Sequence, residues 1–448
     1  MVVGRREVLL GGVGLGLAVA AGPRAGLSQD PNALQACSTH RVAPAGGAID
    51  QTAALQAAAD AAAASGTPLF LPAGIYSTGK LTLKSGTRIE GVPGETILRY
   101  RDGGALIALE GVENVRIAGL VLDGDAKPLG ERGSLLVATE TKHLDVTNCR
   151  LTGSVADGVG LRKVSGWIKD CEIVDIRKAG LVSEDASGLE IAHNHVRDCG
   201  GNGIVVSRSE HGEDATIVSA NRIERIAATS GGSSQSGNGI SVVRASAVVI
   251  NGNRIADCAS SAIRANAGSN CQMIGNSCTR LGEIALHAEF SVEGTLIANN
   301  LVDRAAAGIS VANFARGGRL AVIQGNLIRN LFMRKEADAR GFGIAVEADS
   351  VVTGNVIEGA PAYGIMIGWG PHLRDVSVTD NLIRDALIGI GVSIDPSAGT
   401  ALITKNLIAG TKEGAIRAMS GPTLIGPDLA TASAENFGNV AVYANVAR

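Results

Sequence analysis

The stretch Ile323–Ile328, which reads IQGNLI, decides the fold, because variants of it recur along most of the chain. Eleven copies lie between Val146 and Ile408, and successive copies are 22 to 32 residues apart. Each copy has an apolar residue, a turn residue two positions later, then Asn or Cys, a variable residue and a second apolar residue. A repeat of this length is typical of a solenoid, in which each repeat forms one coil.

The residue before the Asn is the place where the chain must bend. The two apolar residues are an odd number of steps apart, so strict strand alternation would send them to opposite faces. Both can face one core if the chain bends between them, and the residue before the Asn is Gly, Asn or Asp in eight of the eleven copies. These types tolerate a left-handed backbone.

The Asn column is expected to form a buried ladder. Stacked at about 4.8 Å per coil, each amide can donate to one neighbour and accept from the other. The column contains Cys149, Cys171, Asn194, Asn221, Asn253, Asn276, Asn300, Asn326, Asn355, Asn381 and Asn406. Cys149 and Cys171 occupy this column in consecutive coils, so they form either a disulfide or two small buried thiols.

A second strand signature, Gly-apolar-x-apolar, follows most copies, as in Gly203–Val206 (GIVV) and Gly308–Val311 (GISV). Three short strands per repeat predict an all-β solenoid, a right-handed single-stranded parallel β-helix of about 12 coils. The frame of leucine-rich repeats is absent. The segment Asp50–Ala64 is mostly Ala and predicts a helix that caps the N-terminal end, where an open solenoid would expose its core.

The N-terminus has the features of an export signal. Arg5 and Arg6 precede an apolar run from Val8 to Ala21, so residues 1–28 are expected to be a twin-arginine signal that directs the protein to the periplasm or outside the cell. The run is too short for a comfortable membrane span, and none is expected in the mature protein. The remaining divisions are an N-terminal cap at 29–80, repeats at 81–420 and a C-terminal cap at 421–448.

The amino-acid composition limits which classes of partner the protein can have. With 60 Gly and 3% aromatic residues, the chain suits narrow coils with many turns. The net charge of −3 and the absence of a basic run disfavour nucleic acid as a partner. The Cys and His residues have no metal-site spacing, and no cofactor or metal is expected.

The opening of the chain resembles a known superfamily. The segments DQTAALQAAAD, PLFLPAGIY, TRIEG and NVRIAGLVLDG between residues 50 and 124 are similar to the first coils of pectate-lyase-like right-handed β-helix proteins. With the export signal and the Asn coils, the chain also resembles the twin-arginine-exported repetitive proteins of bacteria. The resemblance covers residues 45–420 and implies the fold and a substrate groove along the Gly-apolar strands. The signature motifs of polygalacturonases and alginate epimerases are absent, so it implies no particular reaction.

Two inserts in the same arc point to a site. Residues 227–237 (AATSGGSSQSG) and 332–340 (FMRKEADAR) lengthen two coils between the Asn and the Gly-apolar strand. Long loops on a rigid scaffold often bind ligands, so these two are expected to wall a groove. Tolerated surface growth is the alternative.

Strand parity places polar side chains outward between the inserts. The candidate catalytic residues are Arg264, His287, Glu289 and Glu347. For β-elimination on a uronate, His287 would be the base and Arg264 the stabilising cation. For inverting hydrolysis, two carboxylates roughly 10 Å apart would be acid and base. The candidate substrate-binding residues are Asn266, Arg244, Asn313 and Trp369, although charges on a solvated face and ordinary packing of Trp369 are the plainer alternatives.

These observations predict an exported β-helix protein that acts on, or binds, an acidic or cell-envelope polysaccharide, as a polysaccharide lyase or glycoside hydrolase. The alternative is a non-catalytic carbohydrate-binding or structural protein of the envelope. Convergence of the four catalytic candidates in one cleft, with shifted pKa values, would favour the enzyme.

Overall fold

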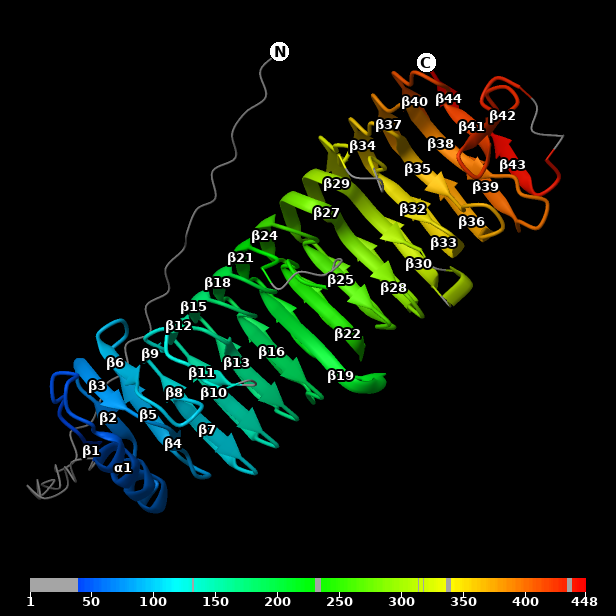
Figure 1. Cartoon of the computed structure of the whole chain (residues 1–448). Coiled ribbons are helices and arrows are strands. Elements are labelled where there is room, and N and C mark those ends of the chain that lie inside the picture. Colours follow the sequence, from blue (N-terminus) through cyan, green and yellow to red (C-terminus); the bar gives the residue numbers. More distant parts are fainter. Residues whose placement is uncertain are drawn as a thin grey trace, which may run out of the picture. The chain divides into compact units, whose positions relative to one another are not determined.

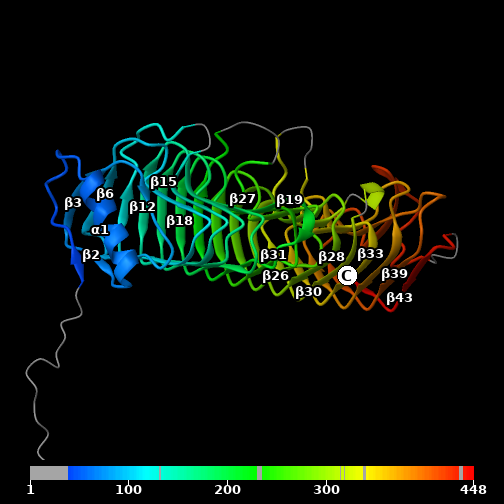
Figure 2. The ribbon, with the colours of Figure 1, turned by 90° about the horizontal axis from the view of Figure 1, so that it is seen from below.

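The computed structural model describes residues 39–130, 133–229, 235–312, 314–316, 318–335, 340–432 and 437–448. The expected export signal at 1–28 lies outside these residues. The described residues form one solenoid of short strands, and the one α-helix among them lies at its N-terminal end (Figures 1 and 2). Within the described ranges, no helix is long and apolar enough to cross a membrane.

The first sheet contains one strand from each coil, and its 16 strands pair in parallel with the same strand of the next coil. It consists of β1 (His40–Arg41), β2 (Leu69–Leu71), β5 (Arg88–Gly91), β8 (Glu113–Ala118), β11 (Lys142–Thr147), β14 (Gly166–Lys169), β17 (Leu189–Ala192), β20 (Ile217–Ser219), β23 (Val249–Asn251), β26 (Cys271–Ile274), β28 (Glu293–Ala298), β30 (Arg319–Gln324), β33 (Ala348–Thr353), β36 (Arg374–Thr379), β39 (Ala401–Thr404) and β43 (Val440–Tyr443).

The second sheet has 28 strands and contains two parallel ladders. The ladder after the Asn column consists of β3 (Gly74–Thr78), β6 (Thr96–Tyr100), β9 (Val121–Asp123), β12 (Arg150–Ser154), β15 (Glu172–Ile176), β18 (His195–Cys199), β21 (Arg222–Ile226), β24 (Arg254–Cys258), β31 (Leu327–Arg329), β34 (Val356–Glu358), β37 (Leu382–Arg384), β40 (Leu407–Ala409) and β44 (Val446–Ala447). The Gly-apolar ladder consists of β4 (Leu81–Thr82), β7 (Ile107–Glu110), β10 (Ser134–Thr139), β13 (Asp157–Arg162), β16 (Leu181–Glu184), β19 (Ile204–Glu213), β22 (Ile240–Ser246), β25 (Ile263–Asn266), β32 (Ile344–Val346), β35 (Tyr363–Ile367), β38 (Ile388–Ser393) and β41 (Ile416–Ser420).

Two long strands join these ladders. Both β27 (Ser277–Glu289) and β29 (Leu301–Val311) run through the two arcs without a break, and β42 (Thr423–Ile425) pairs antiparallel with β41. The fold is therefore the predicted parallel β-helix. It has about 15 turns rather than about 12, because strands before residue 81 and after residue 420 also join the sheets.

The turn column adopts the predicted backbone. All eleven residues before the Asn position have a left-handed φ between 52° and 65°, including Ala220 and Lys405, whose types do not favour it. The bend lets the flanking apolar residues face one core, as Ile323 and Ile328, both 0% exposed, show.

The Asn ladder is present, and each of its side-chain amides donates to the Asn of the following coil. The side-chain amide of Asn300 donates to Oδ1 of Asn326 over 3.0 Å, and the backbone N–H of Asn300 donates to the same oxygen over 2.9 Å. The same amide nitrogen also donates to the Met273 carbonyl of the preceding coil. Asn445 extends the ladder by one member beyond Asn406.

Cysteine begins the ladder. Cys149 and Cys171 are buried free thiols, and the backbone N–H of Cys171 donates to Oδ1 of Asn194 over 3.0 Å. Of the two alternatives for this pair, the small buried thiols are the ones present.

The helix α1 (Thr52–Ser65) covers the N-terminal end of the solenoid, at the blue end of Figure 1. Its buried face consists of Leu55, Ala59 and Ala62. Oδ1 of Asp50 accepts the backbone N–H of Thr52 over 2.9 Å. The helix therefore starts after Asp50, and it ends at Gly66, which has a left-handed φ of 66°.

Candidate functional site

The polar side chains lie on consecutive coils of the Gly-apolar ladder. Strand register pairs Arg264 with His287 and His287 with Ser310. The same register pairs Asn266 with Glu289. Because side chains alternate along a strand, these residues form two adjacent outward rows, as their parity in the sequence predicts.

Glu289 is the centre of a buried polar cluster. Nε of Arg264 donates to Oε1 of Glu289 over 2.5 Å, and Nδ2 of Asn266 reaches the same oxygen over 3.4 Å. Nε2 of His287 lies 3.4 Å from the other oxygen, Oε2. Arg264 is 8% exposed and Glu289 4% exposed, so these are not solvated surface charges. Burial of this pair is tolerable because each charge has a close partner of opposite sign.

His287 has an unusual protonation equilibrium. Burial lowers its pKa to about 3, and the positive charges of Arg264 and Arg340 act in the same direction. The imidazole is therefore neutral near pH 7, with a nitrogen lone pair that can accept a proton.

A pocket of about 320 Å³ opens beside this cluster. His287, Glu289 and Glu347 all line it, so three of the four catalytic candidates converge there. Oε2 of Glu347 accepts the backbone N–H of Phe314 over 2.6 Å. Arg264 instead lines a second pocket of about 210 Å³, together with Asn266. The ion pair between Arg264 and Glu289 thus connects the linings of the two pockets.

Both inserts contribute to this region. Arg340, at the end of the second insert, lines the larger pocket. Arg334 of the same insert reaches back to Glu283, with 3.1 Å between Nη1 and Oε1. Gln235 of the first insert lines the smaller pocket, and its carbonyl accepts a hydrogen bond from Asn202. Residues 230–234 and 336–339 lie outside the described residues.

Arg340 was not among the residues predicted for the site. The sequence did contain a signal for it, because Arg340 is a basic residue of the insert 332–340, which was expected to border the groove. Two residues predicted to bind substrate line neither pocket: Arg244 and Trp369. Arg244 has a left-handed φ of 57°, which breaks the strand alternation, and Trp369 lies 42% exposed in a turn between two glycines. Asn313 lies outside the described residues. In the described part of the chain, no group of three or more His, Cys, Asp or Glu could hold a metal ion.

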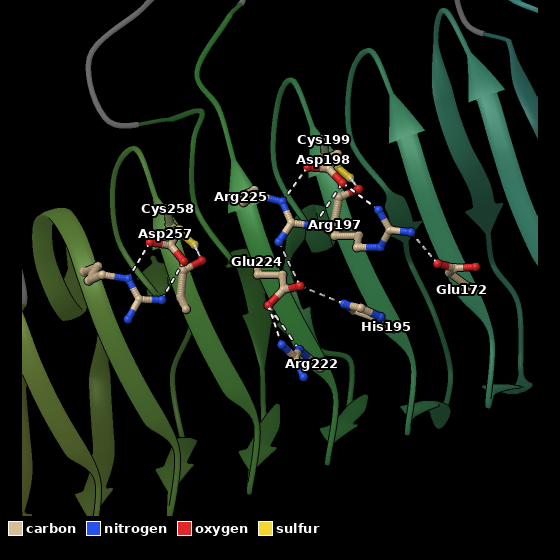
Figure 3. A network of polar contacts seen from close by, with 12 residues as sticks. Glu172, His195, Arg197, Asp198, Cys199, Arg222, Glu224, Arg225, Asp257 and Cys258 are labelled. Carbon is tan, nitrogen blue, oxygen red and sulfur yellow. Dashed lines mark hydrogen bonds and ion pairs between the residues drawn. The ribbon is translucent and has the colours of Figure 1, made fainter.

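A larger set of charges lies on the ladder after the Asn column, where its members satisfy one another (Figure 3). Glu224 contacts His195, Arg222 and Arg225 at 3.1, 3.0 and 2.9 Å. Partial burial opposes ionisation of Glu224, but these hydrogen bonds outweigh it and lower its pKa to about 2. Arg225 also reaches Asp198 of the preceding coil over 2.7 Å. Since these acids are engaged by neighbouring cations, we regard this network as structural.

Comparison with known proteins agrees with this architecture. The profile of the family described as right handed beta helix region matches residues 105–234, 134–279 and 211–383, which together are more than half of the chain. No curated protein sequence matches the chain significantly.

Two solved structures are similar over most of their length. One is the A-module of mannuronan C-5 epimerase AlgE6 from Azotobacter vinelandii, with a TM-score of 0.56 and 16% identity, covering 90% of this chain and 96% of the module. The other is an N-terminal fragment of bacteriophage phi29 gene product 12, with a TM-score of 0.63 and 16% identity, covering 86% of this chain and 72% of the fragment. At this identity the likeness concerns the fold alone.

Proposed function

The chain belongs to the right-handed β-helix family, and from this premise we propose that it binds an acidic polysaccharide in the 320 Å³ pocket and cleaves it by β-elimination. The observation that carries the proposal is the neutral, partly buried His287, held beside the Arg264–Glu289 pair and open to a pocket that Arg340 also lines. We also propose that residues 1–28 export the protein to the compartment where envelope polysaccharides lie.

The proposed reaction uses the pocket residues in distinct roles. The guanidinium of Arg340 pairs with the uronate carboxylate and stabilises the enolate-like charge that develops there. His287 takes the proton from the adjacent carbon, and the electron pair of that C–H bond forms the new double bond. The glycosidic C–O bond breaks, and its oxygen leaves with a proton from solvent or from Glu347.

Glu289 is a positioning residue in this scheme. Its Oε2 faces Nε2 of His287, and its Oε1 is engaged by Arg264. A pKa of about 3 makes His287 a weak base in the free protein. A bound uronate brings a negative charge into the pocket, which raises the pKa of the imidazole toward the useful range.

Hydrolysis by two carboxylates fits this arrangement less well. An inverting hydrolase needs one carboxyl as acid and a second as base. Both oxygens of Glu289 have close partners within the protein, so Glu289 is poorly placed to serve as the second carboxylate of such a pair. The Azotobacter module, named for its action on mannuronan, supports the choice of an acidic glycan only by analogy of fold.

The test is a panel of polymannuronate, polyguluronate, polygalacturonate and neutral dextran, read by ultraviolet absorbance of unsaturated products and by new reducing ends. We expect unsaturated products from at least one uronate and none from dextran. His287→Ala should lose turnover, while His211→Ala, which changes an exposed histidine that lines neither pocket, should keep it. New reducing ends without unsaturation would indicate hydrolysis. Binding without cleavage would favour the non-catalytic alternative.

A further inference from the structure

One outward row of side chains changes character halfway along the solenoid. It consists of the residue that follows each Asn or Cys of the ladder, and strand register pairs its members coil by coil. From Arg150 on, six consecutive members are polar: Arg150, Glu172, His195, Arg222, Arg254 and Ser277. Three of them belong to the charge network of Figure 3. The next six members are all Leu or Val: Leu301, Leu327, Val356, Leu382, Leu407 and Val446.

These six aliphatic side chains, which we call the apolar row, point away from the core. Each is followed along its strand by a core residue, as Leu327 is by the fully buried Ile328. Four members of the row are between 36% and 47% exposed, and Leu301 and Leu382 are half-buried. Their strands, among them β34, β37, β40 and β44, lie on consecutive coils (Figure 1), so the row is about 24 Å long. A continuous apolar strip of this kind is typical of a contact surface.

A row of charges runs beside the apolar row, two residues further along each strand and therefore about 7 Å away. Its members alternate in sign from coil to coil and end at an Ala: Asp303, Arg329, Glu358, Arg384 and Ala409. Glu358 shares its strand with Val356, and Arg384 shares the next strand with Leu382. These are the third and fourth of the six strands, so the middle of the apolar row lies between Glu358 and Arg384.

A second copy of the chain, packed antiparallel on this face, complements both rows. A two-fold axis through the middle of the apolar row places Val356 against Leu382 of the second copy. The same axis places Glu358 against Arg384 of the second copy, and Arg384 against its Glu358. The position of the axis follows from the apolar residues alone, and the charges beside them then meet with opposite sign.

The polar half of the row disfavours a parallel pairing. In a parallel pair every residue of the row faces its own copy, so Arg222 meets Arg222 and Arg254 meets Arg254, and like charges repel. In the antiparallel pair the polar half lies outside the contact between the two apolar rows.

We propose that two copies of this protein associate through the apolar row, with their solenoids antiparallel. The apolar and charged rows of two copies together bury on the order of 1,000 Å², which is the size of weak and transient interfaces, so we expect a reversible dimer that forms only at high protein concentration. No residue of the apolar row lines either pocket of the candidate site, so the inference does not rest on the proposed cleavage.

The test is sedimentation velocity over a series of protein concentrations. We expect the parent to change from monomer to dimer as its concentration rises. Val356→Lys places a charge at the middle of the apolar row and should keep the protein monomeric throughout the series. Val351→Lys is the matched control, because Val351 is 41% exposed on the same coil but belongs to β33 of the first sheet. It should dimerise like the parent.

A charge exchange tests the antiparallel arrangement, and it does not depend on whether Val356→Lys folds. Glu358→Arg places two arginines against each other at both ends of the contact and should raise the Kd of the dimer about tenfold. Arg384→Glu in the same chain should restore the dimer. Both residues are exposed, so neither change disturbs the core.

A parent that stays monomeric over the whole series, or a dimer that Val356→Lys leaves intact, would overturn the inference. A dimer that requires the apolar row but is indifferent to Glu358→Arg would overturn the antiparallel arrangement. Flotation with vesicles of anionic phospholipid covers the other occupant of such a face. A monomer that binds these vesicles, and loses the binding in Val356→Lys, would assign the apolar row to a lipid surface instead of a second copy.

Discussion

Replacing Asn326 by Ala tests the ladder at one of its buried members. Oδ1 of Asn326 accepts both the backbone N–H of Asn300, over 2.9 Å, and its side-chain amide, over 3.0 Å. The amide of Asn326 donates to Oδ1 of Asn355 and to the Ile297 carbonyl. Asn326 is 1% exposed, so solvent cannot replace these partners without entering the core.

The magnitude follows from the groups left unpaired. The substitution removes the acceptor for two buried donors of Asn300 and the side-chain donor for the Ile297 carbonyl. Each stranded group costs about 1–3 kcal/mol. Local relaxation and a water in the vacated space would recover part of this, so we expect a loss of about 3–5 kcal/mol in the free energy of unfolding.

The measurement is urea-induced unfolding followed by circular dichroism, with the slope of the transition compared between variants because a solenoid can unfold in parts. Asn251→Ala is the matched control, since Asn251 is exposed and no side-chain hydrogen bond of it is recorded in the structure. We expect a change within about 0.5 kcal/mol for the control. An Asn326→Ala variant as stable as the control would refute a stabilising role for the ladder.

Four further predictions concern charge, pH and the end of the ladder. Burial depresses the pKa of His287 to about 3, so the unfolded chain binds a proton before the folded chain does as the pH falls from 6.5 toward 3. The stability of the fold should therefore decline over this pH window, and His287→Gln should reduce that decline in thermal melts. The pKa of Glu224, depressed to about 2 by its ion pairs, predicts stability that is present above pH 4.5 and lost as the pH falls toward 2; Glu224→Gln should cost about 1–2 kcal/mol at pH 7 and none at pH 2. Arg264→Ala should cost about 3–5 kcal/mol because it leaves Glu289 buried without its cation, and Glu289→Gln in the same chain should restore part of this, as a double-mutant cycle would measure. Asn445→Ala should cost only about 1 kcal/mol, because its bonds to the ladder are part-buried and water can replace them.

Several features of the site could be predicted from the sequence and others could not. Strand parity placed Arg264, His287 and Glu289 outward on neighbouring coils, and the register confirms it. The parity did not reveal that Arg264 and Glu289 would be almost fully buried, because parity gives the direction of a side chain and not how closely other side chains pack around it. Arg340 enters the pocket from an insert, whose path no periodic pattern describes.

The coil follows from the sequence alone. A bend next to a buried Asn is a local property of six residues, and repetition of that unit requires the units to stack. Asn326 and its neighbours in the column show this. The place where the stacking of coils ends depends instead on the folded chain. Asn445 joins the ladder although it lies 39 residues after Asn406, beyond the spacing of every earlier pair, because its strand pairs with the last coil through space rather than through the period. The tertiary structure also decided the protonation of His287, because that depends on how much water and which charges the folded chain leaves around the ring.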